Sequence, residues 1–404
     1  MEDSYGALIS SLAIENDKRI VLLVMDGLGD CDNDGAGTAL QQARTPNMDA
    51  LAAGSALGLH VPVATGITPG SGPGHLGLFG YDPLFYQVGR GVLSALGVEF
   101  PLEKRDVAAR LNFCTIDKAG NVTDRRAGRI PDSENRRLLA KLKAALKPPA
   151  GVEVFLETEA EHRAVLVLRG GGLDDNIGDT DPQQTGKPPL SPVRGPHAGS
   201  RTARMVDDLL AQTRKILADE PKANMLLARG FAKSPDWPTF ADRYKLTPAA
   251  VAGYPMYRGV ARLLGMPVVS KPTTAADVCA KAAEAMAGHT FVFAHFKYTD
   301  KTGEDGDLAG KIQRIEEMDA ALPSLLAAEP DVLIITGDHS TPPSIKAHSW
   351  HPVPVLMKAP YLRGGDAKHF DEVTCRGGQI GTIPARELLP LAMAHAGKLE
   401  KFGA

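Results

Sequence analysis

One serine in the sequence stands among residues that have almost no side chain. Ser71 lies in the stretch 64–83, ATGITPGSGPGHLGLFGYDP, which contains six glycines and three prolines. Glycine permits unusual backbone dihedrals and close approach of other groups, whereas proline fixes φ and limits flexibility. The stretch therefore predicts a stiff turn that presents the Ser71 hydroxyl to a bulky, charged group. We expect His75, four residues later, to hold this loop rather than to act in catalysis.

Acidic and imidazole side chains flank several short apolar runs elsewhere in the chain. Carboxylates and imidazoles that converge need a cation to offset their repulsion, and such ligands suit Mn²⁺, Mg²⁺ or Zn²⁺. Two metal ions can clamp a phosphoryl group and lower the pKa of a nearby hydroxyl, so that Ser71 needs no histidine base. The candidate metal ligands are Asp26, Ser71, Asp300, Glu304, Asp338, His339 and His348.

Each of these side chains has another interpretation when it is taken singly. Asp26 and Asp338 can cap turns, and Glu304 can stabilise the first turn of a helix. His348 can be a buried, hydrogen-bonded histidine. The metal interpretation is favoured because four acidic strand ends coincide with the glycine-rich segment around Ser71.

The apolar runs must form the elements that position these side chains. Runs at 19–25, 291–295, 332–335 and 353–357 have the length and composition of buried strands, and helical patterns at 275–286 and 308–322 lie between them. This alternation predicts an α/β fold with a mostly parallel sheet and helices on both faces. Ligands of such sheets bind beyond the carboxyl ends of the strands.

The middle of the chain has a different pattern. Strand-like segments at 106–115 and 152–157 accompany amphipathic helical segments at 133–146 and 201–218, and a loop rich in glycine, aspartate and proline spans 170–197. The apolar run 223–227 resembles the strands of the first sheet. We therefore expect a smaller α+β domain, residues 106–220, inserted into a catalytic domain formed by residues 1–105 and 221–404.

Composition excludes several classes of function. The 404 residues carry a formal net charge of −3, which gives no support for binding to nucleic acid or to an anionic membrane. The four cysteines form no Cys-x-x-Cys pair, so a disulfide framework is not expected and a reducing cytoplasm fits. The sequence contains neither a recognisable signal peptide nor an apolar stretch of transmembrane length.

Several segments together resemble a known family, the cofactor-independent (2,3-bisphosphoglycerate-independent) phosphoglycerate mutases, in the branch first associated with archaea. These enzymes belong to the alkaline phosphatase superfamily. The segments that carry the resemblance are VMDGLGD (24–30), ARTPNMDALAAGS (43–55), GSGPGHLGLFGYDP (70–83), GRGVLSALG (89–97), DRRAGR (124–129), DTDPQ (179–183), AGYPMYRGVARLLGM (252–266), TGDHSTPPSIKAHS (336–349), PVPVLM (352–357) and KFGA (401–404).

The resemblance implies an alkaline-phosphatase-like fold and an enzyme that interconverts 3-phosphoglycerate and 2-phosphoglycerate. It implies that Ser71 is the nucleophile, that it carries the phosphoryl group transiently, and that no added 2,3-bisphosphoglycerate is needed. It also implies two divalent metal ions. The residues matching the first metal site are Asp26, Ser71, Asp338 and His339, and those matching the second are Asp300, residue 304 and His348.

The sequence departs from the family at the second metal site. The wider family has Asp-x-x-x-His there, whereas this chain has Asp300-Lys-Thr-Gly-Glu304. Exchanging imidazole for carboxylate favours Mn²⁺ or Mg²⁺ relative to Zn²⁺. It also leaves open that Asp305 or a nearby histidine is the ligand instead of Glu304.

A phosphoglycerate substrate requires cationic partners, and the expected insertion contains several. Arginine can bind carboxylate or phosphate with two parallel hydrogen bonds. Asp124 is a candidate acid/base, although a neighbouring arginine would depress its pKa. For an arginine pair in general, a solvated surface is the simpler interpretation. The candidate substrate-binding residues are Arg125, Arg126, Arg129, His162, Arg163 and, after a strand of the large domain, Lys297.

Two other functions stay open at the level of sequence. One is a metal-dependent phosphohydrolase or phosphotransferase of the same superfamily that acts on another phosphoester or phosphonate. The other is a catalytically silent protein that binds phosphorylated metabolites. The arginines of the insertion favour the mutase, because a mutase must retain glycerate between its two half-reactions and should close over it to exclude water.

Overall fold

The computed structural model describes residues 3–363 and 365–403, and these fall into two compact units. The first unit is formed by Met1–Gln87 and Pro238–Ala404, and the second by Val88–Trp237. The boundaries expected at 106 and 220 therefore lie inside the second unit. The terminal residues of the expected catalytic domain, including Ala404 of the KFGA segment, lie outside the described residues.

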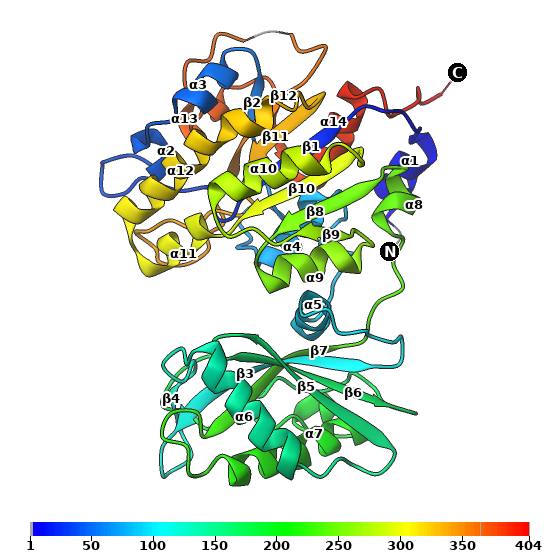
Figure 1. Cartoon of the computed structure of the whole chain (residues 1–404), viewed down its shortest axis with the longest axis vertical. Coiled ribbons are helices and arrows are strands. Elements are labelled where there is room, and N and C mark those ends of the chain that lie inside the picture. The colour runs from blue at the N-terminus through cyan, green and yellow to red at the C-terminus, as the bar shows by residue number, and fades with distance from the viewer. Residues whose placement is uncertain (1–2, 364, 404) are drawn as a thin grey trace. The chain divides into compact units, whose positions relative to one another are not determined.

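An eight-stranded sheet forms the centre of the described part of the first unit, in the order β13-β2-β12-β11-β1-β10-β8-β9 (Figure 1). Its neighbouring strands are parallel except where β12 pairs with β11 and β2. The expected α/β class with a mostly parallel sheet is confirmed. The strands are β1 (Ile20–Met25), β2 (Ala56–Val61), β8 (Pro248–Ala252), β9 (Val268–Ser270), β10 (Phe291–Phe296), β11 (Val332–Thr336), β12 (Val353–Lys358) and β13 (Gly381–Pro384).

The reversed direction of β12 brings an additional segment to the functional edge of the sheet. The carboxyl ends of β1, β10 and β11 lie at one edge because these strands are mutually parallel. Since β12 is antiparallel to β11, its start lies at that same edge. His348 precedes β12 and is therefore delivered to the same place as Asp26, Asp300 and Asp338, which follow the other strands.

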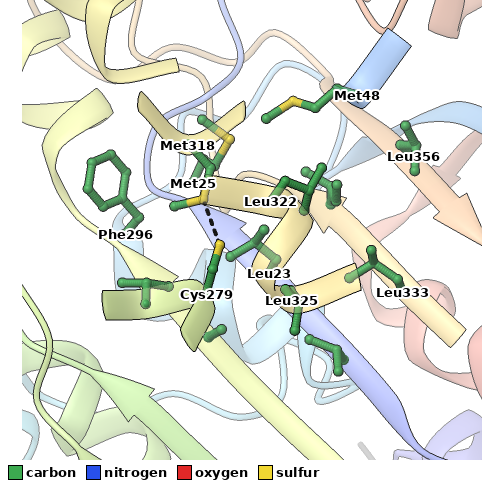
Figure 2. Packing of buried hydrophobic residues seen from close by; sticks show 14 of the residues in the cluster. Leu23, Met25, Met48, Cys279, Phe296, Met318, Leu322, Leu325, Leu333 and Leu356 are labelled. Carbon is green, nitrogen blue, oxygen red and sulfur yellow. Dashed lines mark hydrogen bonds between the residues drawn. The ribbon is translucent and has the colours of Figure 1, made fainter. Parts of the chain in front are cut away.

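One face of the sheet packs against a large apolar cluster. Alternate residues of β1, such as Leu23 and Met25, meet Met318 and Leu322 of α12 and Cys279 of α10 (Figure 2). The Cys279 thiol donates to Met318 Sδ at 3.6 Å. The helices that contribute to this cluster are α2 (Ala39–Gln42), α3 (Pro46–Ala52), α10 (Ala275–Ala285), α12 (Leu308–Leu326) and α13 (Glu372–Arg376).

The alternate strand residues pack on the opposite face, so helices cover both sides as expected. Phe79, which follows α4, meets Phe293 of β10 edge-to-face with ring centroids 4.9 Å apart. Such aromatic pairs add to the free energy of area burial. The remaining helices of the first unit are α1 (Ser4–Leu12), α4 (Ser71–Leu78), α8 (Phe240–Tyr244), α9 (Pro255–Leu263), α11 (Tyr298–Asp305), η2 (Ala385–Glu387) and α14 (Leu388–His395).

The second unit is an α+β structure built on an antiparallel sheet. Two helices, α6 and α7, cover its main apolar cluster, and α5 packs against β3 and β7. Its elements are α5 (Arg90–Gly97), β3 (Val107–Ile116), β4 (Val122–Asp124), α6 (Asp132–Ala145), β5 (Val152–Ala160), β6 (Arg163–Gly170), η1 (Gly195–His197), α7 (Arg201–Ile216) and β7 (Met225–Ala232).

The run 223–227 was expected to return to the large sheet, and that expectation is wrong. It opens β7, which pairs antiparallel with β3 of the second unit, for example Leu111 with Ala228. A short buried apolar run specifies a strand but not the sheet it joins, because hydrogen-bond partners are set by tertiary packing. The second unit consequently extends past residue 220.

Two expectations from composition agree with the structure. All four cysteines are free in the described part of the chain. No helix among the described residues is both long enough and apolar enough to cross a membrane.

The packing of the core in the first unit leads to a prediction about the free energy of unfolding. Leu322 is fully buried in the cluster of Figure 2, so Leu322→Ala removes apolar contacts and leaves a cavity. We expect the free energy of unfolding to fall by about 2–5 kcal/mol in urea denaturation. Leu84→Ala is the control, because Leu84 is 57% exposed and its truncation should change that free energy by less than about 0.5 kcal/mol. Equal losses in both variants would contradict the assignment of the core.

Candidate functional site

Ser71 is the first residue of a helix rather than part of a stiff turn. Gly70 is the N-cap of α4, and Ser71, Gly72 and Pro73 form the first turn. Proline is tolerated there because the first backbone N–H groups of a helix have no partner within it. The same unpaired N–H groups and the helix dipole favour an anion at this end. Ser71 is 7% exposed, and its Oγ lies 3.3 Å from His339 Nε2.

Close approach explains one glycine of this segment. A Cβ atom at Gly74 would lie 2.5 Å from the carbonyl oxygen of Asp338, which no real Cβ atom tolerates. The absence of a side chain therefore lets α4 rest directly against the residue after β11. His75 secures the same contact, since its Nδ1 lies 2.8 Å from the Ser71 carbonyl oxygen and 3.2 Å from Asp338 Oδ2. This geometry fits the loop-holding role expected for His75.

A first group of candidate metal ligands joins the ends of β1 and β11. Potential ligand atoms of Asp26, Asp338 and His339 all lie within 4.8 Å of one another, and all three residues are buried. His339 Nε2 is 3.4 Å from Asp26 Oδ1 and 3.2 Å from Asp338 Oδ2. Ser71 Oγ lies beside the same nitrogen. The structure thus brings together the four residues expected at the first metal site.

The donors of this group fit a divalent cation. Asp26 Oδ1 is buried and has no hydrogen-bond partner among the described residues. Asp26 Oδ2 and Asp338 Oδ2 are buried as well, and their contacts include ion pairs with Lys297 at 3.1 Å and His75 at 3.2 Å, respectively. Burial alone would raise the pKa of Asp26, but Lys297 and His295 hold it well below its usual range, so the carboxylate keeps its charge. Burial lowers the pKa of His339, which favours the neutral imidazole that a metal requires. Buried anionic oxygens without donors are costly unless a cation meets them.

A second group contains Asp300, His348 and again His339. His348 Nε2 lies 3.5 Å from Asp300 Oδ1, and the His339 and His348 rings stack with centroids 3.6 Å apart. His348 is held from its other side, because its Nδ1 lies 2.9 Å from the Pro69 carbonyl oxygen. The two groups therefore adjoin through His339, which the family pattern placed at the first site alone.

Glu304 lies outside the compact part of the second group. It follows Asp300 by one turn of α11, its side chain is 43% exposed, and Oε1 is 4.0 Å from His348 Nε2. Its role as a ligand stays a prediction.

Lys297 connects the carboxylates of the two groups. Its Nζ forms an ion pair with Asp300 Oδ2, lies 3.1 Å from Asp26 Oδ2, and donates to the Tyr257 hydroxyl at 3.2 Å. Burial would lower the pKa of Lys297, but Asp26, Tyr257 and Asp300 raise it well above its ordinary value. The ammonium thus balances ligand charge here, and its expected contact with substrate phosphate stays a prediction.

The other residues expected to bind substrate lie in the second unit, and some of their side chains already form hydrogen bonds within the protein. Arg125 forms two hydrogen bonds with Asp181, of 2.9 and 2.7 Å, so its guanidinium fork is already engaged. Asp124 accepts the backbone N–H groups of Arg126 at 2.7 Å and Gly128 at 2.6 Å. Its carboxylate therefore organises the 124–129 turn. This contact weakens the case for Asp124 as an acid/base.

His162 was counted among the cations, and the structure corrects that assignment. The side chain is 1% exposed, and burial together with Arg163, Arg126, Arg110 and Arg129 lowers its pKa to about 3. It is therefore neutral at physiological pH. A basic residue in sequence predicts a positive charge only where water or a carboxylate stabilises that charge.

Two arginines that the sequence analysis missed share a face of the sheet with Arg163. Arg110 pairs directly with Arg229 across β3 and β7, and Arg163 pairs with Asn112 across β6 and β3. Residues opposite each other, or two apart on one strand, project from the same face. Arg110 Nε is buried without an acceptor among the described residues, and burial lowers the pKa of Arg110 to about 10. The alternation of inward and outward side chains along β3 is the only feature of the sequence that indicates this arginine cluster.

The first unit also contains contacts that no motif revealed. His295, on β10, lies 3.4 Å from Asp26 Oδ2 and stacks on Tyr257 with centroids 3.7 Å apart. Thr341 and Lys311 contact the segments that carry the second group. Thr341 lies within the family segment 336–349, but these contacts are evident only in the folded chain.

The fold and these side chains define a class: α/β proteins with a carboxylate–imidazole centre around a serine at the carboxyl ends of parallel strands. The sequence profile described as 2,3-bisphosphoglycerate-independent phosphoglycerate mutase matches residues 52–223. A protein of Thermus thermophilus named probable 2,3-bisphosphoglycerate-independent phosphoglycerate mutase is 51% identical over 401 residues, which cover 98% of this chain and 99% of that protein. One of the same name from Aquifex aeolicus is 46% identical and covers 98% and 100%.

Two solved structures are also similar to this chain. A Pyrococcus horikoshii protein aligns with a TM-score of 0.81 at 30% identity, over 96% of this chain and 99% of that one. The cofactor-independent phosphoglycerate mutase of Thermoplasma acidophilum aligns with a TM-score of 0.68 at 31% identity, over 94% and 100%. This chain belongs to the family of 2,3-bisphosphoglycerate-independent phosphoglycerate mutases.

The contact between α4 and Asp338 leads to a prediction about Mn²⁺ affinity. Gly74→Ala should push α4 away from the first group, because the added Cβ meets a backbone oxygen that cannot rotate aside. We expect at least about a tenfold weaker affinity for Mn²⁺ in calorimetric titration. Gly54→Ala is the control, since a Cβ there meets nothing within 4 Å. Unchanged Mn²⁺ affinity in a folded Gly74→Ala protein would contradict this account.

Proposed function

We propose that this protein interconverts 3-phosphoglycerate and 2-phosphoglycerate through a phosphoserine formed on Ser71. The observation that carries the proposal is the position of Ser71 Oγ, at a helix N-terminus and 3.3 Å from His339 Nε2, beside the buried carboxylates of Asp26 and Asp338. The family assignment supplies the substrate class. The reaction is intramolecular, so the substrate itself provides the phosphoryl group and no 2,3-bisphosphoglycerate is consumed.

The proposed phosphoryl transfer takes place in two half-reactions. The Ser71 hydroxyl loses its proton and Oγ attacks phosphorus, the bond between phosphorus and the 3-oxygen of glycerate breaks, and that oxygen takes up a proton. Glycerate then reorients, its 2-hydroxyl loses a proton and attacks the phosphorus of the phosphoserine, the bond between phosphorus and Oγ breaks, and Oγ takes up a proton. Two divalent cations, Mn²⁺ or Mg²⁺ in preference to Zn²⁺, would neutralise phosphate charge and acidify the Ser71 hydroxyl when bound. Their holders would be Asp26, Ser71, Asp338 and His339 at one site, and Asp300, His348 and Glu304 at the other.

Cations of the second unit would hold the anionic substrate. Arg110 and Arg229 face the same side of the sheet as Arg163, and like charges directly opposite each other destabilise a sheet unless anions join them. Asp181 neutralises Arg229 in part, at 3.3 Å. The buried Nε of Arg110 favours a further anion at this face, and a carboxylate or phosphate group suits it. We assign substrate binding to Arg126, Arg129 and Arg163 together with this pair, and a positioning role to Arg125.

An isomerase assay tests the reaction itself. Wild-type protein with Mn²⁺ should convert 3-phosphoglycerate to 2-phosphoglycerate without 2,3-bisphosphoglycerate, and a chelator should abolish the conversion reversibly. Ser71→Ala should lower kcat by at least about a thousandfold while the protein stays folded, because the nucleophile is lost. An absolute requirement for 2,3-bisphosphoglycerate, or a tenth of wild-type turnover in Ser71→Ala, would overturn the mechanism. Phosphate release without isomerisation would identify a phosphohydrolase.

The arginines make a separate prediction about substrate retention. Arg126→Ala and Arg163→Ala should each remove about 1.5–3 kcal/mol of charge-assisted hydrogen bonding, roughly ten- to a hundredfold in kcat/KM. The ratio of free phosphate to 2-phosphoglycerate should rise, because water competes for the phosphoserine when glycerate is held less firmly. Arg214→Ala, on α7, is the control. Wild-type rates of isomerisation in both arginine variants would contradict their assignment to substrate binding. An unchanged ratio of free phosphate to 2-phosphoglycerate would contradict their role in retaining glycerate.

A further inference from the structure

We propose that Thr341 is a positioning residue shared by both groups of candidate metal ligands, and that Lys311 fixes it in place. The inference rests on the proposed function only in taking these groups as metal sites. Thr341 is fully buried two residues after His339, and its hydroxyl contacts one ligand from each group.

The Thr341 hydroxyl has one proton, and its two contacts determine where that proton points. Oγ1 lies 2.7 Å from Asp300 Oδ1 and 3.0 Å from His339 Nδ1. An ionised carboxylate can only accept, so Thr341 donates to Asp300. The Thr341 oxygen must then accept the Nδ1 proton of His339.

This direction fixes the tautomer of His339. With the proton on Nδ1, Nε2 bears the lone pair, and Nε2 is the atom that faces Ser71, Asp26 and Asp338. A hydrogen bond to the second ring nitrogen is the usual means of orienting a metal-binding histidine. One hydroxyl therefore aims the imidazole at the first group and a carboxylate oxygen at the second.

The surroundings leave Thr341 little freedom to move. A Cβ at Gly27, whose φ is +63°, would lie 2.5 Å from Thr341 Oγ1, and a Cβ at Gly303 would lie 2.3 Å from the Thr341 carbonyl oxygen. Both glycines thus allow the segments bearing Asp26 and Asp300 to close around this residue. Such tight packing holds the hydroxyl between its two partners.

Lys311 ties the same residue to the segment after β1. It is fully buried on α12, and its Nζ donates to the carbonyl oxygens of Thr341 at 3.0 Å and Gly29 at 3.1 Å. The Gly29 oxygen also accepts the Thr341 backbone N–H at 2.9 Å. A buried ammonium is costly unless it is hydrogen-bonded. Its two carbonyl partners come from the segments that follow Asp26 and His339, so the ammonium holds both in register.

Substitutions of Thr341 test the proposal. Thr341→Val removes the hydroxyl at nearly constant volume, and Thr341→Ser retains it. Thr302→Val is the matched control, because the Thr302 hydroxyl donates to the Tyr298 and Thr299 carbonyl oxygens of its own helix. Each metal-free protein is titrated with Mn²⁺ by calorimetry, with thermal unfolding as a check of the fold. We expect Thr341→Val to weaken binding at both sites by about 10- to 100-fold, and the other two to stay within about threefold of wild type.

A second readout follows the imidazole directly. Nitrogen-15 NMR of metal-free protein should show His339 protonated at Nδ1 in wild type and Thr341→Ser, and should show that preference lost in Thr341→Val. Wild-type Mn²⁺ affinity in folded Thr341→Val overturns the proposal. Weakening at one site alone, or an equal loss in Thr341→Ser, also overturns it. Failure of the proposed function has a different signature, because wild-type protein itself would then bind no Mn²⁺ or would not isomerise 3-phosphoglycerate.

Discussion

The burial of several carboxylates at one edge of a sheet is the constraint on which this structure depends. Asp26, Asp300 and Asp338 are almost completely withdrawn from water, and ionised carboxylates that are buried together repel one another strongly. The Lys297 ammonium offsets part of this charge. In the proposed function, divalent cations bound at this edge would offset the negative charge that remains.

Close packing transmits that constraint to the rest of the first unit. Ser71 can face the carboxylates only because Gly74 lets α4 touch the end of β11, and Asp300 can face them only because Gly303 lets α11 approach Thr341. The apolar cluster of Figure 2 fixes the strands and α12 beneath this edge. Lys311, on the same helix, then reaches up to two strand-end segments. The geometry of the site therefore depends on backbone contacts as much as on the candidate ligands themselves.

The second unit has the opposite electrostatic problem, which is an excess of positive charge on one sheet face. Arg110, Arg163 and Arg229 are brought together by strand pairing rather than by nearness in sequence. Asp181 contacts Arg229, and the buried Glu159 lies near Arg110 and Arg163. In the proposed function, an anionic substrate would add negative charge at this face, and divalent cations would add positive charge among the carboxylates of the first unit.

The sequence by itself determined the α/β class, the strands β1, β10, β11 and β12 of the large sheet and the polar residues next to them, because hydrophobic periodicity and strand-end chemistry are local properties. It also identified Ser71 and the acidic and imidazole residues that the structure gathers into two adjoining groups, since a run of linked motifs matches one family. Tertiary structure alone decided that β7 joins the smaller sheet, that His162 is neutral, and that Arg125 is engaged by Asp181. It alone placed Arg110 and Arg229 opposite each other in the sheet of the second unit, and Thr341 and Lys311 next to the segments that carry the candidate metal ligands of the first unit. The physical reason is that strand partners, burial and hydrogen-bond acceptors depend on residues far away in the chain, and a local pattern contains no information about them.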